Sequence, residues 1–351
     1  QLAGNLCRCT GYRPIIDAAA QACTGTAADG WAARQAETAA NLAALNDGED
    51  VFLGDGAGFT AIPASAGSLL ALAAQHEDAV IVAGATDVGL WITKQMRELP
   101  RIIHVTGVPE LHDISHKGAL LSIGAAATYA EAESALASLA PDVTTVVSRI
   151  GSRQVRSSGT IGGNIANGSP IGDMPPMLIA LGARLVLRSA DAERQMPLED
   201  FFIAYGKQDR REGELVWRID VPELHHGEQF RAYKLSKRLD QDISAVMAAF
   251  KLRIAAGRVS AARIAFGGMA ATPKRALKTE AALVGASLAD EASWQPALAA
   301  LQGDYHPISD MRASATYRIE AAQGLLRKAL LEAGGTAEAD IRIAPAGGRA
   351  A

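Results

Sequence analysis

The segment 156–176 gathers residue types that suit a phosphate-bearing ligand. Its glycines are Gly159, Gly162, Gly163, Gly168 and Gly172. A backbone without side chains can approach a ligand closely, while hydroxyl, amide and carboxylate groups can reach ribose and phosphate oxygens. The residues that supply these groups are Thr160, Asn164, Asn167, Ser169 and Asp173. A mobile surface loop would carry polar filler, whereas spaced isoleucines and three prolines interrupt this segment. We therefore predict a rigid, partly buried loop.

A second segment, 80–89, has the pattern of a strand that enters a glycine turn and then a helix. Such a junction directs backbone N–H groups and the positive end of the helix dipole at one point, which suits a pyrophosphate. A turn of this kind that binds nothing remains an alternative. The segment lacks the GxGxxG spacing and the following acidic residue of a Rossmann fold, which is therefore disfavoured.

Two cysteines, Cys7 and Cys9, are separated by one residue just before a turn at residues 10–11. Iron-sulfur clusters and structural zinc need about four thiolate or imidazole ligands. With Cys23 the head of the chain offers at most three thiols, so it cannot complete such a site alone. Two ordinary cysteines beside a turn remain an alternative.

The elements expected around these segments are those of an α+β protein. Strand and helix patterns alternate in the middle of the chain, whereas strands precede helices beyond residue 230, which indicates a separate lobe. The expected strands are 79–82, 101–105, 120–123, 184–187, 246–255 and 259–266. The expected helices are 31–45, 68–75, 88–96, 129–139, 141–150, 175–181, 274–284 and 314–332.

Composition narrows the class of protein. The 351 residues are 49% hydrophobic and 21% charged, with a formal net charge of -4, which favours small-molecule or protein partners over nucleic acid. No apolar run reaches the roughly 18 residues that span a bilayer, so we expect no membrane insertion. Three cysteines fit a reducing compartment, and we predict a cytoplasmic protein. Because the first residue is Gln, we also expect a missing N-terminal segment.

Residues 4–16 resemble the signature that closes the second 2Fe-2S domain of xanthine dehydrogenases, aldehyde oxidases and related molybdenum hydroxylases. The resemblance implies that Cys7 and Cys9 are two of four cluster ligands. In that family an upstream CxxC supplies the other two, and this chain does not contain it. Cys23 matches no ligand position, and we expect it to be a small buried residue.

Both glycine-containing segments resemble the paired loops of the FAD-binding domain of the vanillyl-alcohol-oxidase and p-cresol-methylhydroxylase type, as found in molybdenum hydroxylases. The resemblance implies an FAD-binding domain at 58–226 and an α+β lobe at 227–333. A helical remnant of a 2Fe-2S domain at 1–24, a connector at 25–57 and a disordered tail at 334–351 complete the chain. The implied FAD contacts are Val80, Ile81, Val82, Ala83, Gly84, Ala85, Thr86, Asp87, Ile150, Gly151, Thr160, Gly162, Gly163, Asn164, Asp173, Val216 and Lys234.

Residues 230–244 are similar to the family's link into its last lobe, where a lysine lies beside the flavin. By this resemblance Lys234 takes a catalytic role, because a cation near the pyrimidine edge of the flavin would favour the reduced, anionic ring. A solvated basic strand is the alternative. Thr160 to Asn164 would contact phosphate, and Asp173 would meet a polar part of the cofactor.

The family relationship implies an electron path. A molybdenum site oxidises the substrate, electrons pass through 2Fe-2S clusters to FAD, and a hydride passes to NAD. The chain has no molybdopterin domain, so we expect a separate molybdopterin-containing large subunit in a hetero-oligomer. Residues 167–173 and 240–246 most resemble the small subunits of bacterial xanthine dehydrogenases. A flavin subunit of another molybdenum hydroxylase, of aldehyde or nicotinate type, and an assembly protein that lost its cofactor remain alternatives.

Overall fold

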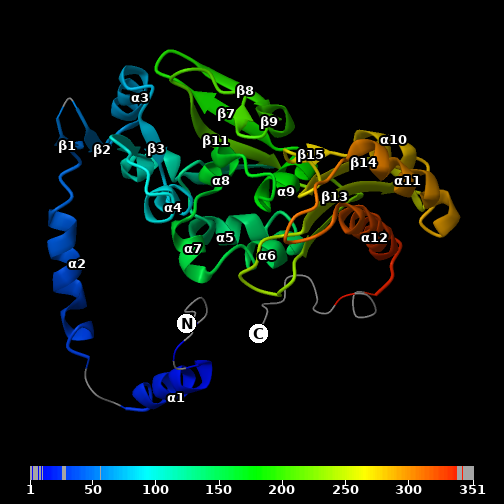
Figure 1. Ribbon diagram of the computed structural model, residues 1–351, viewed down its shortest axis with the longest axis horizontal. Coiled ribbons are helices and arrows are strands. Elements are labelled where there is room, and N and C mark those ends of the chain that lie inside the picture. Colours follow the sequence, from blue (N-terminus) through cyan, green and yellow to red (C-terminus); the bar gives the residue numbers. More distant parts are fainter. Residues whose placement is uncertain are drawn as a thin grey trace.

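A computed structural model describes residues 2, 7, 9, 11–25, 29–55, 57–337 and 342. Figure 1 shows helices distributed around separate sheets, with α1 and α2 lying away from them. The helices are α1 (Tyr12–Ala22), α2 (Gln35–Ala44), α3 (Ala66–Gln75), α4 (Val88–Thr93), α5 (Tyr129–Ala137), α6 (Pro141–Val147), α7 (Arg153–Ser158), α8 (Ile161–Asn167), α9 (Met174–Leu181), α10 (Leu277–Leu283), α11 (Gln295–Asp304) and α12 (Ala315–Ala333).

The strands form three main sheets and one short hairpin in the part of the chain that the structure describes. The first sheet has the order β1-β2-β4-β3, with β1 (Val51–Gly54), β2 (Phe59–Ile62), β3 (Val80–Val82) and β4 (Arg101–His104). The second has the order β5-β6-β11-β7-β8, with β5 (Ile114–His116), β6 (Leu120–Gly124), β7 (Arg184–Arg188), β8 (Glu193–Pro197) and β11 (Leu215–Pro222). The hairpin joins β9 (Phe202–Ala204) to β10 (Lys207–Gln208). The third has the order β12-β13-β14-β15, with β12 (Glu228–Leu235), β13 (Val246–Ala255), β14 (Arg258–Gly267) and β15 (Lys274–Arg275).

Strand direction differs between the sheets. In the first sheet β2, β4 and β3 run parallel, and α3 and α4 lie between them in the sequence. The second and third sheets are antiparallel. Strand β1 pairs with β2, so the stretch predicted as a connector contributes a strand to the first sheet.

Capping residues and prolines in the sequence mark the positions where several helices begin. Thr128 and Glu131 form a capping box at the start of α5, in which each side chain bonds the backbone of the other residue. Ser65 caps α3 and Ser314 caps α12. In each case the side chain accepts a hydrogen bond from a backbone N–H of the first turn. Helix α9 has two prolines in its first turn, where a missing N–H costs no hydrogen bond.

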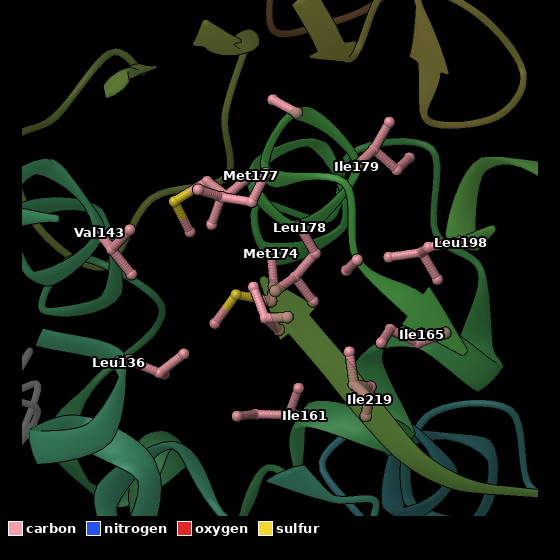
Figure 2. Packing of buried hydrophobic residues seen from close by; sticks show 14 of the residues in the cluster. Leu136, Val143, Ile161, Ile165, Met174, Met177, Leu178, Ile179, Leu198 and Ile219 are labelled. Atoms are coloured by element: carbon pink, nitrogen blue, oxygen red, sulfur yellow. The ribbon is translucent and has the colours of Figure 1, made fainter. Parts of the chain in front are cut away.

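Helix α9 lies at the centre of the largest core, and all eight of its residues are buried. Figure 2 shows Met174, Met177 and Leu178 among residues from α6, α8 and β11. The same core includes Phe230 and Met247 from the third sheet. Each fully buried side chain of this size contributes about 1.5–3 kcal/mol, so this core binds the second sheet, its helices and the third sheet together.

Two smaller cores complete the molecule. One joins the first sheet to β11 through residues such as Ile103 and Trp217, and the other lies between the third sheet and helices α10 to α12. Helices α1 and α2 have no buried residue, so the assignment of α1 to a 2Fe-2S domain remains a prediction. None of the described helices is long and apolar enough to cross a membrane.

Residues 334–337 and 342 of the predicted tail are described. The side chain of Arg342 is 7% exposed, and its guanidinium pairs with Asp142 at 2.7 Å and also with Glu332. It lies over the ring of Tyr233, with 5.3 Å between the guanidinium carbon and the ring centroid. Residues 338–341 and 343–351 lie outside the described residues, so the prediction of disorder there is not tested.

Candidate functional site

The turn after β3 presents unused backbone donors. None of the hydrogen bonds of the described chain uses the N–H groups of residues 84–87. Ala85 adopts the left-handed conformation at φ 54°, which bends the chain between strand and helix. Consecutive N–H groups in such a turn make a concave site for an anion. Helix α4 has only six residues, so the turn itself, rather than a long helix dipole, carries this prediction.

The two segments singled out by the sequence lie against each other. A Cβ on Gly84 would lie 1.8 Å from the carbonyl oxygen of Ser158, so only glycine allows this approach. Asn167 donates from Nδ2 to Asp87 Oδ2 at 2.5 Å, which ties the end of α8 to the start of α4. The structure therefore brings residues 80–87 and 158–167 into one site.

The glycine-rich segment differs from its prediction because it contains a helix. Thr160 caps α8, and its Oγ1 accepts from Gly163 N at 3.0 Å. The N–H groups of Ile161 and Gly162 donate to Ala127 and Ala125, each at 3.0 Å. The backbone donors at this end of α8 thus already have partners. Any phosphate contact here must come from side chains, in contrast to the turn at 84–87.

Contacts within the protein also explain why glycine occupies two positions of this segment. A Cβ on Gly162 would lie 2.4 Å from Cβ of Ala125, and a Cβ on Gly163 would lie 2.6 Å from Oγ1 of Thr160. Their lack of side chains therefore serves packing and capping. The approach of a ligand to the backbone at these two positions stays a prediction.

Two buried polar atoms beside this segment have no hydrogen-bond partner among the described residues. They are Oδ1 of Asn164 and the hydroxyl of Tyr129. Burial raises the pKa of Tyr129, and the negative charge of Asp173 raises it further. A buried orphan polar atom costs free energy unless a ligand or water satisfies it, so these atoms are candidates to bond a polar group of a ligand.

A buried ion pair lies next to them. Lys234 on β12 donates from Nζ to Asp173 Oδ2 at 2.6 Å and to Ser244 Oγ at 2.9 Å. Ser244 Oγ donates in turn to Asp173 Oδ1 at 2.5 Å. All three residues are buried. The alternative of a solvated basic strand is wrong for Lys234, whose side chain is 2% exposed.

Arg149 connects two further predicted FAD contacts, Ile150 and Gly151, to the cluster of Lys234, Asp173 and Ser244. Its guanidinium donates to the carbonyl of Lys234 at 2.9 Å and to Ser236 Oγ at 3.1 Å. Burial lowers the pKa of Arg149, and the charge of Asp173 opposes that change. Ile150 follows it and packs on the largest core, while Gly151 has φ 55°. Arg149 therefore fixes residues 149–151 against the end of β12.

Val216 lies in β11, which contacts α8, and a register shift between residues 216 and 218 marks a bulge there. It is partly buried between two cores. The bulge changes which face of the sheet the next side chain takes. Val216 is thus placed beside the helix that bears Asn164.

The three cysteines fall in the first 23 residues of the chain, outside the two segments of the site. Cys7 is partly exposed and Cys9 is exposed. Cys23 is exposed as well, so the expectation of a small buried residue is wrong. No three histidine, cysteine or acidic side chains gather as a metal site would require in the described ranges.

Sequence reasoning did not assign roles to Ser244, Arg149 or Tyr129. Ser244 stood inside a segment chosen for its resemblance, but nothing in its type or spacing indicated a contact with residue 173. The donors at 84–87, the orphan atoms and the lysine-aspartate pair together fit a ligand with phosphates and a polar ring. That is the chemistry of a flavin dinucleotide.

Comparison with known proteins finds two family domains in the chain. Residues 57–224 match the FAD binding domain in molybdopterin dehydrogenase, and residues 231–333 match the CO dehydrogenase flavoprotein C-terminal domain. The glyceraldehyde dehydrogenase medium chain of Sulfolobus acidocaldarius is 32% identical over 233 residues, which is 66% of this chain and 82% of that protein.

Two further similarities bear on the length of the chain. Xanthine dehydrogenase/oxidase of Rattus norvegicus is 31% identical over 325 residues, but the chain spans only 24% of that protein. CO dehydrogenase from Oligotropha carboxidovorans has a TM-score of 0.73 and 29% identity, covering 79% of this chain and 97% of that chain. The chain belongs to the FAD-binding subunits and domains of the molybdenum hydroxylase family of oxidoreductases.

Proposed function

We propose that the chain is the FAD-binding electron-transfer subunit of a xanthine dehydrogenase. In this function it takes electrons from 2Fe-2S clusters and delivers a hydride to NAD, while a separate molybdopterin-containing subunit oxidises hypoxanthine and xanthine to urate. FAD, when bound, would supply the exchange between single-electron and hydride chemistry. The observation that carries the flavin part is the row of unused N–H donors at 84–87, together with the buried Asp173–Lys234 pair.

Different residues of the chain would bind the phosphates of FAD and influence its ring. The N–H groups of 84–87 are free to hold a pyrophosphate, and Gly84 lets that turn rest on the backbone of Ser158. Lys234 provides a buried positive charge, which favours any neighbouring group that gains negative charge. Because Asp173 compensates part of that charge, we expect a moderate rather than a large effect on the flavin.

The cluster part of the proposal rests on Cys7 and Cys9. We propose that these two thiols ligate a 2Fe-2S cluster together with two cysteines from a preceding segment. The fusion of such a signature to a flavin domain, and the identity shared with the xanthine dehydrogenase of Rattus norvegicus, support the purine assignment. NAD as the acceptor belongs to the same proposal.

A flavin subunit of another molybdenum hydroxylase is the second candidate. It is favoured by the similarity to a glyceraldehyde dehydrogenase medium chain and to quinoline 2-oxidoreductase from Pseudomonas putida 86, with a TM-score of 0.71. The residues described here would serve either enzyme, since the flavin site does not touch the substrate that is oxidised at molybdenum.

Two measurements test the proposal in sequence. The full chain, mixed with FAD and desalted, should retain flavin absorbance in a one-to-one ratio; a chain that retains none would support a protein that kept the fold without the cofactor. The complex with its large subunit should then reduce NAD with xanthine. Activity with aldehydes and none with xanthine would establish the second candidate.

A further inference from the structure

The segment between β12 and β13 returns a serine to the buried ion pair. Ala245 donates from its N–H to the carbonyl of Leu235 at 2.8 Å, which extends the ladder of the two strands and brings Ser244 beside Lys234. Ser244 is 1% exposed. Asp173, by contrast, comes from the first matched region of the chain. The serine therefore lies where the two matched regions meet.

The hydroxyl of Ser244 accepts one hydrogen bond and donates another. It accepts from Lys234 Nζ at 2.9 Å and donates to Asp173 Oδ1 at 2.5 Å. Lys234 takes the other carboxylate oxygen, Oδ2, at 2.6 Å. A hydroxyl can do both because it carries one donor and two acceptor lone pairs. Each carboxylate oxygen thus has its own donor, and Lys234 pairs with only one of them.

Hydrogen bonds made by Arg318 and Gly268 fix the backbone next to Ser244. Arg318 of α12 is buried and donates to the carbonyls of Ala245 and Gly268. Gly268 donates from its N–H to the carbonyl of Pro170 at 2.7 Å, three residues before Asp173. This arrangement holds the backbone on both sides of the cluster, so the hydroxyl of Ser244 has little freedom to turn elsewhere.

We propose that Ser244 is a positioning residue for flavin electron transfer, which keeps Asp173 from pairing with Lys234 through both oxygens. Without the hydroxyl, the carboxylate can engage the ammonium group with both oxygens, and more of the lysine charge is compensated. With it, part of that charge remains available to the bound flavin. This inference rests on the proposed function, because it needs FAD beside Lys234.

The test is a redox titration of the full chain loaded with FAD. Ser244→Ala should lower the reduction potential of the flavin, in the same direction as Lys234→Met. Ser244→Cys keeps the side-chain volume with a weak donor, so it should shift the potential in the same way.

Two comparisons separate positioning from a general structural effect. Ser260→Ala is the matched control, because it removes a hydroxyl that donates to the carbonyl of Arg253 at 3.0 Å on the same sheet. The potential should not move in this variant. In a Lys234→Met background, Ser244→Ala should cause no further shift, since the serine acts through the lysine.

The outcomes are distinct. A potential equal to that of the control, or a shift that persists without Lys234, would overturn the role of Ser244 while leaving FAD binding intact. If the unchanged chain retains no FAD, the proposed function fails and this inference fails with it. Unchanged flavin content with an additive shift would show that Ser244 acts through the packing of the lobe alone.

Discussion

Two buried clusters of charged residues lie on either side of strand β12. On one side Lys234 pairs with Asp173, and the orphan oxygen of Asn164 lies in the same site. On the other side Arg342 bonds Asp142 and Glu332, and Arg231 also pairs with Glu332 at 3.0 Å. Successive side chains of a strand point to opposite faces, which explains how one strand serves both clusters.

The difference between the clusters indicates their roles. In the Arg342 cluster, a guanidinium from the chain itself pairs with Asp142 and shares Glu332 with Arg231, so each acid has a cation. In the Lys234 cluster, the nearby polar atoms of Asn164 and Tyr129 have no partner among the described residues; beside Arg342 the hydroxyl of Tyr233 also lacks one. We interpret the first as a stability element and the second as a ligand site. Each prediction below tests this distinction.

The largest effect should come from Arg342→Ala. Loss of the guanidinium leaves Asp142 buried without its counter-ion and leaves Glu332 with Arg231 alone, and breaking such a buried pair costs about 3–5 kcal/mol. Denaturant unfolding should report this loss in the free energy of unfolding. Arg327→Ala, on the exposed face of α12 with an ion pair at 3.8 Å, is the control and should change stability by less than about 1 kcal/mol. Equal effects would remove the distinction.

The Lys234 cluster should instead respond through the flavin. Lys234→Met removes a positive charge and should lower the reduction potential, whereas Asp173→Asn removes the compensating negative charge and should raise it. We expect shifts of about 30 mV, which is about 1.4 kcal/mol for a two-electron couple. Redox titration of both variants measures this. Arg342→Ala should leave the potential unchanged, and shifts of the same sign in both site variants would disprove the charge role.

Substitutions at the start of α8 should lower the amount of FAD that the chain retains. We expect this effect to be smaller than those of the substitutions at Arg342, Lys234 and Asp173. Gly163→Val places a Cβ 2.6 Å from Oγ1 of Thr160 and should displace the cap, so that FAD is released. Thr160→Ala removes the same hydrogen bond and should cost about 1 kcal/mol. Flavin content after gel filtration measures both. Gly324→Ala, which meets no atom within 4 Å, should retain FAD fully; full retention in Gly163→Val would exclude α8 from the site.

The smallest effect should appear in the pH dependence of stability. Burial alone would raise the pKa of Glu332, but the hydrogen bond and charge of Arg342 outweigh it and hold the pKa below its ordinary 4.5. An acid whose pKa is lower in the folded state stabilises the fold when ionised, so this contribution is present above pH 4.5 and lost as the pH falls through the folded value. Thermal unfolding below pH 4.5 should show this loss, and Arg342→Ala should reduce the slope.

Strongly periodic elements could be predicted from the sequence. Helices α3, α5, α9 and α12 and the strands β13 and β14 were expected within a few residues of their bounds. Helix α8 was not, because glycine and asparagine favour turns and loops. The structure shows that packing overrides this preference: Ile161 and Ile165, four residues apart, are both buried in the largest core, and Thr160 supplies the cap. That spacing was the available signal.

The site itself was predictable only in part. The resemblance implied which segments would contact FAD, and residues 80–87 and 158–167 do lie together in the fold. It could not show that the donors of 161–163 are already engaged, or that Ser244 joins Lys234 to Asp173, because both depend on contacts between distant parts of the chain. The expected helix at 274–284 begins only at Leu277, since Lys274 and Arg275 pair with β14.

The largest core crosses the interval between the two matched regions. Phe230, from the interval itself, and Met247, from the second region, are buried in one cluster with Leu178 and Ile219 from the first. A chain cut after residue 224 would expose that apolar surface on both fragments, so we expect neither half to fold alone. Exchange of the C-terminal region between relatives would therefore require α9 to be exchanged with it, although the family boundary lies well beyond that helix.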